Sequence, residues 1–495
     1  MSETSSPLYP PALSYINGEW VPAFSGDTFD VLNPYSQEVI AQVPNMDRRD
    51  CLAAIEAANH VAISWREMLP SQRAKLLMNW HDLILEHRDE LARLMVTEQG
   101  KPLPEARGEI VYGASFIKWF AEEAVRAYGS IIPPFAQGRR LLVIRQAVGV
   151  VAAITPWNFP HAMITRKCAP ALAAGCPVVI KPAEDTPLSA LALAALAEKA
   201  GFPRGVFNVV TTDRAGAGQV GETLCLDTRI RKVGFTGSTT IGKHVMAQAA
   251  STVKRVSLEL GGNAPLIIFD DARLDLALRG VFVSKFRNAG QTCICANRIF
   301  VHRARMEEVT HSLIERAERF HLGNGLDASV DMGPLINERA VDRVSQLVKT
   351  AVEQGAKLLT GGTSLNQELS PDPKGPFWAP TILSNVSNEM EIAQLELFAP
   401  IVTLIPFEDD AEVIRMANDT PFGLAAYFFT EDHRRIWRVA EALEYGMVAV
   451  NDGALSTAVA PFGGVKESGI GREGSSWGLD EFQELKYIML GGLHE

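Results

Sequence analysis

A cysteine in a short polar stretch is the strongest candidate for chemistry in this sequence. Residues 284–298 read SKFRNAGQTCICANR and hold Cys293 and Cys295, two of six cysteines. Cys293 follows Gly290-Gln291-Thr292, a turn-like tripeptide that would leave the thiol open to a small substrate. Such a thiol could act as a nucleophile. A buried structural cysteine is the alternative. A zinc site is disfavoured, because no second cysteine pair or histidine cluster stands at zinc spacing.

Two further residues have side chains suited to assist a nucleophile. Glu259 ends an apolar run in VSLELGGNAP, residues 256–265, where a carboxylate is costly unless it is paired or protonated. Asn158 lies in ITPWNFP, residues 154–160, between two prolines that stiffen the backbone. A carboxylate of this kind can act as a base, and a fixed amide can stabilise an oxyanion. A structural ion pair for Glu259 and a turn-capping role for Asn158 are the alternatives.

Composition narrows the class of protein. The 495 residues are 47% hydrophobic, enough for a large core and two or three domains. With 47 basic against 58 acidic residues, the net charge of −11 argues against a nucleic-acid partner. The sequence has no apolar run of about 18 residues, so we expect no membrane span. Residues 1–12 lack a signal-peptide apolar region and are expected to form a disordered lead-in. Scattered cysteines favour a reducing, cytoplasmic location.

The pattern of apolar residues and breakers predicts the elements that position these side chains. Helical spacing predicts amphipathic helices over 48–68, 71–99 and 105–128. From Gly149 onward, apolar strand-like runs alternate with helical segments. The strands are expected at 150–155, 177–181, 206–211 and 232–236. This alternation predicts a parallel sheet with helical crossovers, as in nucleotide-binding domains.

A glycine-rich stretch offers a generic phosphate site. Residues 216–221, GAGQVG, match the GxGxxG pattern and follow a predicted strand. By the general rule such a loop cradles a pyrophosphate. A lone match is a weak signal, and we interpret these glycines as turn and helix-packing residues.

Taken together and in order, the motifs ITPWNFP, LELGG and GQTC resemble the aldehyde dehydrogenase superfamily. Further matching segments are KPAEDTP (181–187), GFTGSTTIG (234–242) and PFGGVKESGIGRE (461–473). The resemblance extends from about Tyr15 to the C-terminus. It implies an α/β fold with a Rossmann-type cofactor domain (1–130 and 148–258) and an α/β catalytic domain (259–471). A small β oligomerisation extension (131–147 and 472–495) would make a homo-dimer or homo-tetramer.

The resemblance also implies a nicotinamide dinucleotide cofactor. Its pyrophosphate would lie at Gly237 and Ser238, where a helix begins and free N–H groups can meet phosphate oxygens. Glu396, in ELFAP, would hold the nicotinamide ribose, although Leu395 and Ala399 depart from the family pattern E-E-x-F-G-P. Glu184 would accept hydrogen bonds from the adenosine ribose and repel a 2′-phosphate, so NAD is expected to be preferred to NADP. The other cofactor contacts implied are Thr155, Pro156, Trp157, Lys181, Ala183, Leu260 and Phe398.

The chemistry that the resemblance implies is aldehyde oxidation without a metal. The Cys293 thiolate would attack the aldehyde carbon, and the Asn158 amide with the Cys293 N–H would hold the oxyanion. Hydride would leave for the nicotinamide, and Glu259 would activate water to hydrolyse the thioester. Glu259 separates this chain from acylating relatives that use coenzyme A. A disulfide between Cys293 and Cys295 under oxidation is a further hypothesis, with simple packing of Cys295 as its alternative.

Three residues favour an aldehyde that carries a distal carboxylate. Arg166 lies in ITRK, Arg287 lies six positions before Cys293, and Ser456 lies in the loop before PFGG. Two guanidiniums and a hydroxyl suit a planar anion. In these positions they resemble the succinate-semialdehyde dehydrogenases. Glutarate semialdehyde or a small sulfonate-bearing aldehyde such as sulfolactaldehyde is the alternative substrate. A catalytically idle structural protein of the same fold is a further alternative.

Overall fold

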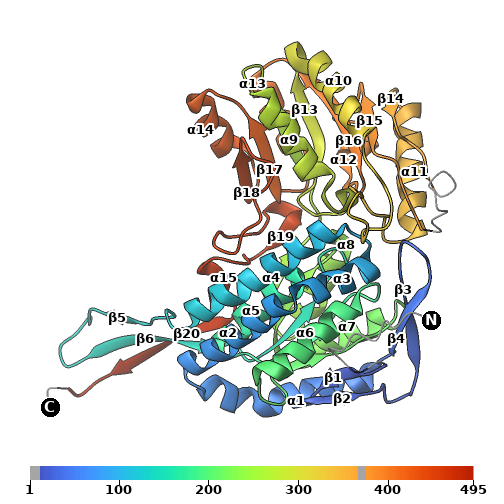
Figure 1. The fold of residues 1–495 in the computed structure, drawn as a ribbon. Helices are drawn as coiled ribbons and strands as arrows, with labels where there is room; N and C mark the ends of the chain where they lie inside the picture. The colour runs from blue at the N-terminus through green and yellow to red at the C-terminus, as the bar shows by residue number, and fades with distance from the viewer. Residues whose placement is uncertain (1–9, 11, 366–374, 494–495) are drawn as a thin grey trace.

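The computed structural model describes residue 10 and residues 12–365 and 375–493. Two α/β lobes lie one above the other in Figure 1, and a narrow β-arm projects from the lower lobe. The predicted lead-in over 1–12 lies almost entirely outside the described residues, as does most of a polar loop expected over 363–375. No helix within the described ranges is long and apolar enough to cross a membrane.

The lower lobe is built on a six-stranded sheet with the order β19-β11-β10-β7-β8-β9. Five strands are parallel and only β19 is antiparallel. The strands are β7 (Val150–Ile154), β8 (Val178–Lys181), β9 (Phe207–Val209), β10 (Ile230–Thr236), β11 (Arg255–Glu259) and β19 (Gly469–Ile470). The predicted parallel sheet with helical crossovers is therefore confirmed.

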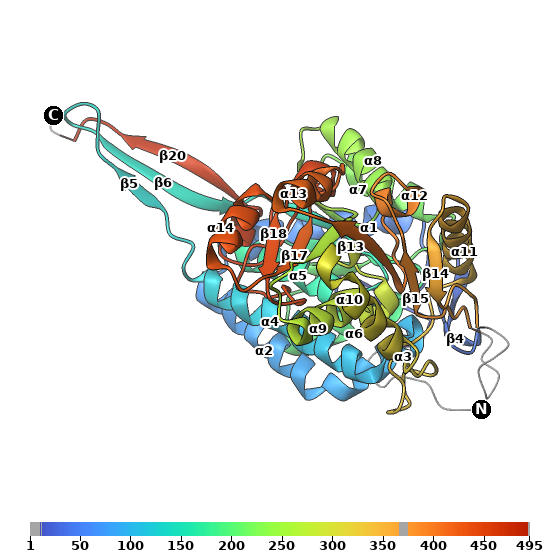
Figure 2. The same ribbon diagram turned by 90° about the horizontal axis from the view of Figure 1, so that it is seen from above.

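Helices surround this sheet (Figures 1 and 2). They are α1 (Arg48–Glu67), α2 (Pro70–Glu86), α3 (Arg88–Gln99), α4 (Leu103–Ala124), α5 (Ala162–Ala174), α6 (Pro187–Ala200), α7 (Ala217–Leu226) and α8 (Thr239–Ala250). The single helix expected over 71–99 was wrong. It is divided at His87, whose φ of −91° and ψ of 14° interrupt the helical path. No glycine or proline marks this break in the sequence.

The GxGxxG stretch forms the start of α7. Gly216 lies at its N-cap, where a Cβ would come within 2.3 Å of the Thr212 hydroxyl, so this glycine is a turn residue as predicted. A Cβ added to Gly218 or Gly221 would meet none of the described atoms within 4 Å. The prediction that these two glycines serve close helix packing was therefore wrong.

The upper lobe contains a seven-stranded sheet with the order β14-β15-β16-β13-β12-β17-β18. The strands are β12 (Ala264–Ile268), β13 (Ala296–His302), β14 (Lys357–Thr360), β15 (Thr381–Ser384), β16 (Ile401–Phe407), β17 (Ala425–Phe429) and β18 (Met447–Val450). The helices are α9 (Leu274–Lys285), α10 (Met306–Ala317), α11 (Glu338–Glu353), α12 (Glu391–Gln394), α13 (Asp410–Asn418) and α14 (His433–Ala442).

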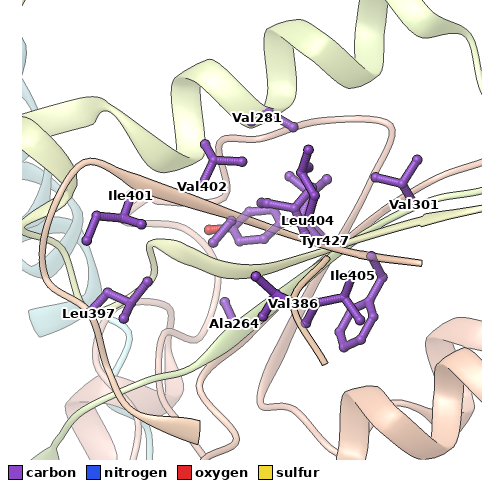
Figure 3. Packing of buried hydrophobic residues seen from close by; sticks show 14 of the residues in the cluster. Ala264, Val281, Val301, Val386, Leu397, Ile401, Val402, Leu404, Ile405 and Tyr427 are labelled. Carbon is purple, nitrogen blue, oxygen red and sulfur yellow. The ribbon is translucent and has the colours of Figure 1, made fainter. Parts of the chain in front are cut away.

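The core of the upper lobe fixes the start of β13, which follows the candidate cysteine. Consecutive residues of β16 from Ile401 to Ile405 are buried on both faces of the sheet, as expected for a covered parallel strand. Figure 3 shows the side chains of Ile401, Val402, Leu404 and Ile405 in one cluster with Val301 of β13 and Tyr427 of β17. The Tyr427 hydroxyl also donates to the Ile294 carbonyl at 2.8 Å, which ties the cysteine stretch to this core.

The remaining strands form the arm and two small hairpins. The arm pairs β5 (Ser130–Ile132), β6 (Arg140–Ala147) and β20 (Gln483–Leu490), so the C-terminal segment lies against the hairpin as the sequence predicts. Figures 1 and 2 both show this arm extending away from the two lobes. The hairpins pair β1 (Ser14–Ile16) with β2 (Glu19–Val21) and β3 (Thr28–Leu32) with β4 (Val39–Pro44). The short α15 (Trp477–Asp480) precedes β20.

Candidate active site

The candidate residues of the lower lobe meet at the carboxyl edge of its sheet. Thr155 follows β7, Lys181 ends β8, Gly237 follows β10 and Glu259 ends β11. The register pairs Ile154 with Lys181 and Thr236 with Glu259, so these ends are level with one another. Ligands of open α/β sheets bind at such an edge. The sequence motifs are therefore brought together by the parallel pairing of their strands.

A cavity of about 380 Å³ opens at this edge between the two lobes. It brings the candidate nucleophile and amide together with most of the predicted cofactor residues. Its lining includes Pro156, Trp157, Asn158, Gly237, Ser238, Leu260, Cys293, Glu396 and Phe398, together with Met163, Thr236, Gly261 and Arg343. Trp157 and Phe398 meet edge to face, with their ring centroids 5.6 Å apart.

The cavity has features that fit a dinucleotide. Ser238 caps α8 and accepts a hydrogen bond from Ile241 N, so the helix N-terminus faces the cavity beside small residues. Glu396 is partly buried in the lining and accepts a hydrogen bond from Gly262 N at 3.1 Å. Burial raises the pKa of Glu396 to about 7. Phe398 still lines the cavity, although Ala399 replaces the family's glycine.

The other predicted cofactor residues lie beside this cavity. Thr155 and Ala183 are buried, and Thr155 donates its N–H to the Lys181 carbonyl at 3.1 Å. Lys181 Nζ lies 3.7 Å from the Glu184 carboxylate. This pair is not a surface ion pair, because the Lys181 side chain is only 7% exposed.

Glu184 lines a second cavity of about 260 Å³ that also contains Asp185 and Arg214. Burial raises the pKa of Asp185 to about 6, while Arg339 and Arg214 act against that rise. No arginine stands next to Glu184 in the sequence, but the fold places Arg214, 30 residues further along the chain, in the lining of the same cavity.

The candidate nucleophile lies on a sharply turning backbone segment of the upper lobe. Cys293 follows the short 3₁₀ helix η1 (Arg287–Gly290), in which Asn288 and Ala289 have φ values of 52° and 54°. Gly261 and Gly262, which follow Leu260, let the backbone after β11 come close to the backbone of Cys293. A Cβ on Gly262 would lie 2.3 Å from the Cys293 carbonyl oxygen, so only glycine fits.

The Asn158 amide lies beside this segment. Its Nδ2 donates to the Gln291 carbonyl at 3.0 Å, which leaves its second hydrogen for another acceptor. Among the described residues, its Oδ1 has no hydrogen-bond partner. The side chain is therefore fixed next to Cys293 with a donor to spare.

The Cys293 thiol is protonated at neutral pH in this state. Burial raises its pKa to about 12, although Arg166 acts in the opposite direction. Part of the residue's surface stays exposed, so a substrate can reach it. A base must therefore remove the proton when the nucleophile acts.

Glu259 is a buried carboxyl near Cys293 and has the chemistry for such proton transfers. It is 2% exposed, and its Oε2 has no partner within the described parts of the chain. Burial and the nearby Glu473 carboxylate raise its pKa well above the ordinary value, while Arg166 and Lys167 act against this rise. Gly463 closes over it, since a Cβ there would lie 3.0 Å from Glu259 Oε1.

A buried network that the sequence did not reveal supports the Asn158 loop. Lys101 Nζ donates to the Glu109 carboxylate at 2.6 Å and to the Asn158 carbonyl at 2.7 Å. Asn288 Nδ2 donates to the same carbonyl at 3.1 Å. The Glu109 carboxylate also accepts from the N–H groups of His161 and Ala162 at the start of α5. These contacts hold the amide and cysteine segments at a fixed separation.

Neither of the predicted anion-binding arginines belongs to the lining of the cofactor cavity. Arg166 is 1% exposed and stacks on Phe462, with its guanidinium carbon 4.0 Å from the ring centroid. Its Nε donates to Glu473, and Glu473 also accepts from Lys167. Its Nη2 has no partner among the residues described. One face of the guanidinium is therefore fixed and one donor remains available.

The other two predicted substrate residues are half-buried nearby. Arg287 lies over Phe159, 4.7 Å from the ring centroid, and Ser456 lies in the loop after β18. Arg287 and Ser456 each lower the pKa of Tyr112 of α4, and Arg166 does the same, so all three lie close to its phenol. The structure thus brings Arg166, Arg287 and Ser456 to one place from three separate segments.

Cys295 lies in the core beneath the site. It is 1% exposed, and its thiol lies 3.6 Å from the Lys285 carbonyl. No disulfide joins it to Cys293 in this structure, since both cysteines are free. Over the described ranges, no group of three or more His, Cys, Asp or Glu side chains is arranged to hold a metal ion.

Comparison with known proteins decides the family. The model of the aldehyde dehydrogenase family matches residues 20–488. The chain belongs to the aldehyde dehydrogenase family. It is 52% identical to a succinate-semialdehyde dehydrogenase [NADP(+)] of Escherichia coli K12, over 96% of this chain and 97% of the relative. It is 50% identical to a 3-sulfolactaldehyde dehydrogenase of Pseudomonas putida, over the full length of both.

Solved structures agree with this assignment. An E. coli NADP-dependent enzyme superposes with a TM-score of 0.95 at 51% identity, covering 98% of this chain and 99% of its own. The predicted aldehyde dehydrogenase fold is thereby confirmed, and the protein is an NAD(P)-dependent aldehyde dehydrogenase.

Proposed function

We propose that this enzyme oxidises succinate semialdehyde, or a close acid semialdehyde, to the dicarboxylate. The observation that carries the proposal is Arg166, a buried guanidinium whose Nη2 has no partner among the described residues and whose charge acts on Cys293. Burying a charge with an unused donor is costly unless a ligand uses it. A distal carboxylate is the ligand that this donor, Arg287 and Ser456 would bind.

The chain's own residues can carry the reaction from Cys293 onward. With its proton passed to a base, the Cys293 sulfur would attack the aldehyde carbon. The spare hydrogen of the Asn158 amide and the Cys293 N–H would hold the oxyanion. When bound in the 380 Å³ cavity, the nicotinamide cofactor supplies the hydride acceptor. Expulsion of hydride from the adduct leaves a thioester on Cys293.

Glu259 would complete the cycle by activating the hydrolytic water. Its raised pKa and unpartnered oxygen suit a base that takes a proton and later returns it to solvent. A base in this place supports hydrolysis of the thioester, and hence a non-acylating enzyme.

We propose NAD as the preferred cofactor, with weaker use of NADP. The Glu184 carboxylate would accept hydrogen bonds from the ribose hydroxyls and would repel the negative charge of a 2′-phosphate. Arg214, which lines the same cavity, lessens this repulsion, so the preference is moderate. The groups that would hold the cofactor are Thr155, Pro156, Trp157, Lys181, Ala183, Glu184, Gly237, Ser238, Leu260, Glu396 and Phe398.

The domain roles follow the two sheets. Residues 1–130 and 148–258 would form the cofactor domain, and 259–471 the catalytic domain. Residues 131–147 and 472–495 would form the extension that joins subunits of a homo-dimer or homo-tetramer. Exposed apolar residues on the arm, such as Ile131 (78%) and Leu485 (66%), support burial against a second copy. Six free cysteines fit the predicted cytoplasmic location.

Glutarate semialdehyde and sulfolactaldehyde are the alternative substrates, because the same donors would bind a longer acid or a sulfonate. An idle structural role is disfavoured by the intact set of Cys293, Glu259 and Asn158. Measuring kcat/KM by NADH formation for succinate, glutarate and sulfonate aldehydes, with butanal as the neutral control, tests the proposal. Equal kcat/KM for butanal and the acid aldehydes would contradict it.

A further inference from the structure

A tyrosine in helix α4, Tyr112, lies close to both candidate anion-binding arginines. The Tyr112 ring meets the Phe116 ring edge to face, with centroids 4.9 Å apart. It also packs against the cluster of Phe159, Ala162 and Met163 on the loop and helix that follow Asn158. The ring is therefore held on two sides by neighbouring apolar side chains.

The same two phenylalanines lie beside the arginines. The Arg166 guanidinium carbon is 6.0 Å from the Phe116 centroid, and that of Arg287 is 4.7 Å from the Phe159 centroid. Because Tyr112 packs on the Phe116 ring and on the cluster that contains Phe159, its phenol lies near both guanidiniums. The charges of Arg166 and Arg287 accordingly act on its ionisation, each lowering the pKa of Tyr112.

The Tyr112 hydroxyl is a buried donor without an acceptor. Within the described chain, its oxygen has no hydrogen-bond partner that meets ordinary limits of distance and angle. The Ser456 hydroxyl lies close enough to influence its ionisation but does not complete such a bond. Burial outweighs the two arginines and raises the pKa of Tyr112, so the phenol stays protonated and can donate. An unpaired buried hydroxyl needs an explanation.

Glu473 limits how many donors of Arg166 are available to a ligand, because it already accepts a hydrogen bond from this arginine. It accepts from Arg166 Nε, which lies on the same edge of the guanidinium as Nη2, and it is in turn held by Lys167. Arg166 therefore cannot turn its whole guanidinium to a ligand. A ligand anion beside Nη2 needs further donors from Arg287, Ser456 and the phenol. We propose that the Tyr112 hydroxyl donates a hydrogen bond to the distal anionic group of the substrate, as a further specificity-determining contact.

This inference rests on the proposed acid-aldehyde activity, and one variant tests it. Tyr112→Phe removes the hydroxyl and keeps the ring. Loss of one hydrogen bond to a charged group should lower kcat/KM for succinate semialdehyde by about 10- to 100-fold, mainly through KM. The value for butanal should change less than about 3-fold. Since the hydroxyl has no partner in the free protein, the Tm of Tyr112→Phe should equal or exceed that of the wild type.

Tyr445→Phe is the matched control. Its hydroxyl donates to the Ala417 carbonyl at 2.6 Å and accepts from Arg298 at 2.9 Å, in the upper-lobe core. This variant should lower Tm and leave the ratio of acid to neutral kcat/KM unchanged. The opposite pattern in Tyr112→Phe, a lower ratio at undiminished Tm, is the signature of substrate contact.

The outcomes separate the two proposals. If the wild type prefers the acid aldehyde and Tyr112→Phe keeps that preference, or loses both activities equally, the Tyr112 contact is wrong and the substrate class stands. If the wild type shows no preference for the acid aldehyde, both proposals are overturned.

Discussion

Lys101 Nζ donates a hydrogen bond to the backbone carbonyl of Asn158 across 2.7 Å, although the two residues are 57 positions apart. The lysine is buried between α3 and α4, and its charge is balanced by Glu109 at 2.6 Å. Burial lowers the pKa of Lys101, while Glu109 opposes that change. The amide that would hold the oxyanion is thus positioned by an ion pair outside the cavity.

Lys101→Met should therefore affect both stability and catalysis. It leaves the Glu109 carboxylate buried without its cation, which should lower the free energy of unfolding by about 3–5 kcal/mol. The Asn158 loop would also lose a contact, so kcat should fall for acid and neutral aldehydes alike. Urea denaturation and steady-state assays measure the two effects. The double variant Lys101→Met/Glu109→Gln should recover part of the stability, and no recovery would contradict the ion-pair argument.

Glu259→Gln should separate acylation from hydrolysis. Without the base, the first turnover should release NADH in a burst close to one equivalent per site, followed by a steady-state rate at least about 100-fold lower. Stopped-flow absorbance of NADH measures both phases. Cys293→Ser is the control and should show neither phase. An unchanged steady-state rate in Glu259→Gln would exclude this residue as the essential base.

The raised pKa of Glu259 gives a pH dependence with a definite sign. Its carboxyl must be ionised to act as base, so kcat should increase as the pH rises through that pKa. Arg166 lowers the pKa of Glu259. Arg166→Gln removes the positive charge, so the rising limb of the profile should move to higher pH. Butanal is the substrate for this measurement, because it needs no anion contact. A limb that stays in place or moves to lower pH would be inconsistent with this coupling.

Arg287→Ala should impair the binding of acid aldehydes selectively. The guanidinium makes no salt bridge with the carboxylates of the described residues and lies over Phe159, so its removal should disturb the fold little. The value of kcat/KM for succinate semialdehyde should fall by an amount equivalent to about 1.5–3 kcal/mol of transition-state stabilisation, the usual contribution of a hydrogen bond to a charged group. Comparison with butanal supplies the reference. An equal loss for both aldehydes would mean that Arg287 supports the fold instead.

Glu184→Ser should narrow the preference for NAD over NADP, mainly by lowering KM for NADP. The change removes the carboxylate that would face a 2′-phosphate and leaves Lys181 and Arg214 near it. Arg214→Ala is the complementary variant and should widen the preference, because it removes positive charge from the same cavity. Initial rates with each cofactor test both. A wild-type enzyme that favours NADP would overturn the role given to Glu184.

The catalytic candidates could be predicted because each lies in a contiguous motif. Asn158 follows β7 and Glu259 ends β11, and parallel pairing brings these two strand ends together. Their supporting groups could not be predicted in this way. Arg166 and Glu473 are 307 positions apart, and no local pattern signals such a pair.

The same reason explains the other omissions. Tyr112 and Lys101 occupy ordinary positions in a helix and a turn, and only the tertiary structure gives them their neighbours. Arg214 and Glu184 line one cavity although they are 30 positions apart, because the chain between them forms a crossover of the α/β sheet. The break at His87 arises from one residue's backbone conformation, which helical periodicity cannot indicate.

Arg166 belongs to α5 of the lower lobe, whereas Arg287 belongs to η1, which directly follows α9 of the upper lobe (α5 and α9 are labelled in Figure 1). A distal carboxylate bound by both would act as a removable crosslink between the halves of the enzyme. Dicarboxylate binding should then slow the hydrogen exchange of amides along the seam, such as Gly262 N, which donates to Glu396. A neutral aldehyde has no distal anion to bind both arginines, so it should leave this hydrogen exchange unchanged.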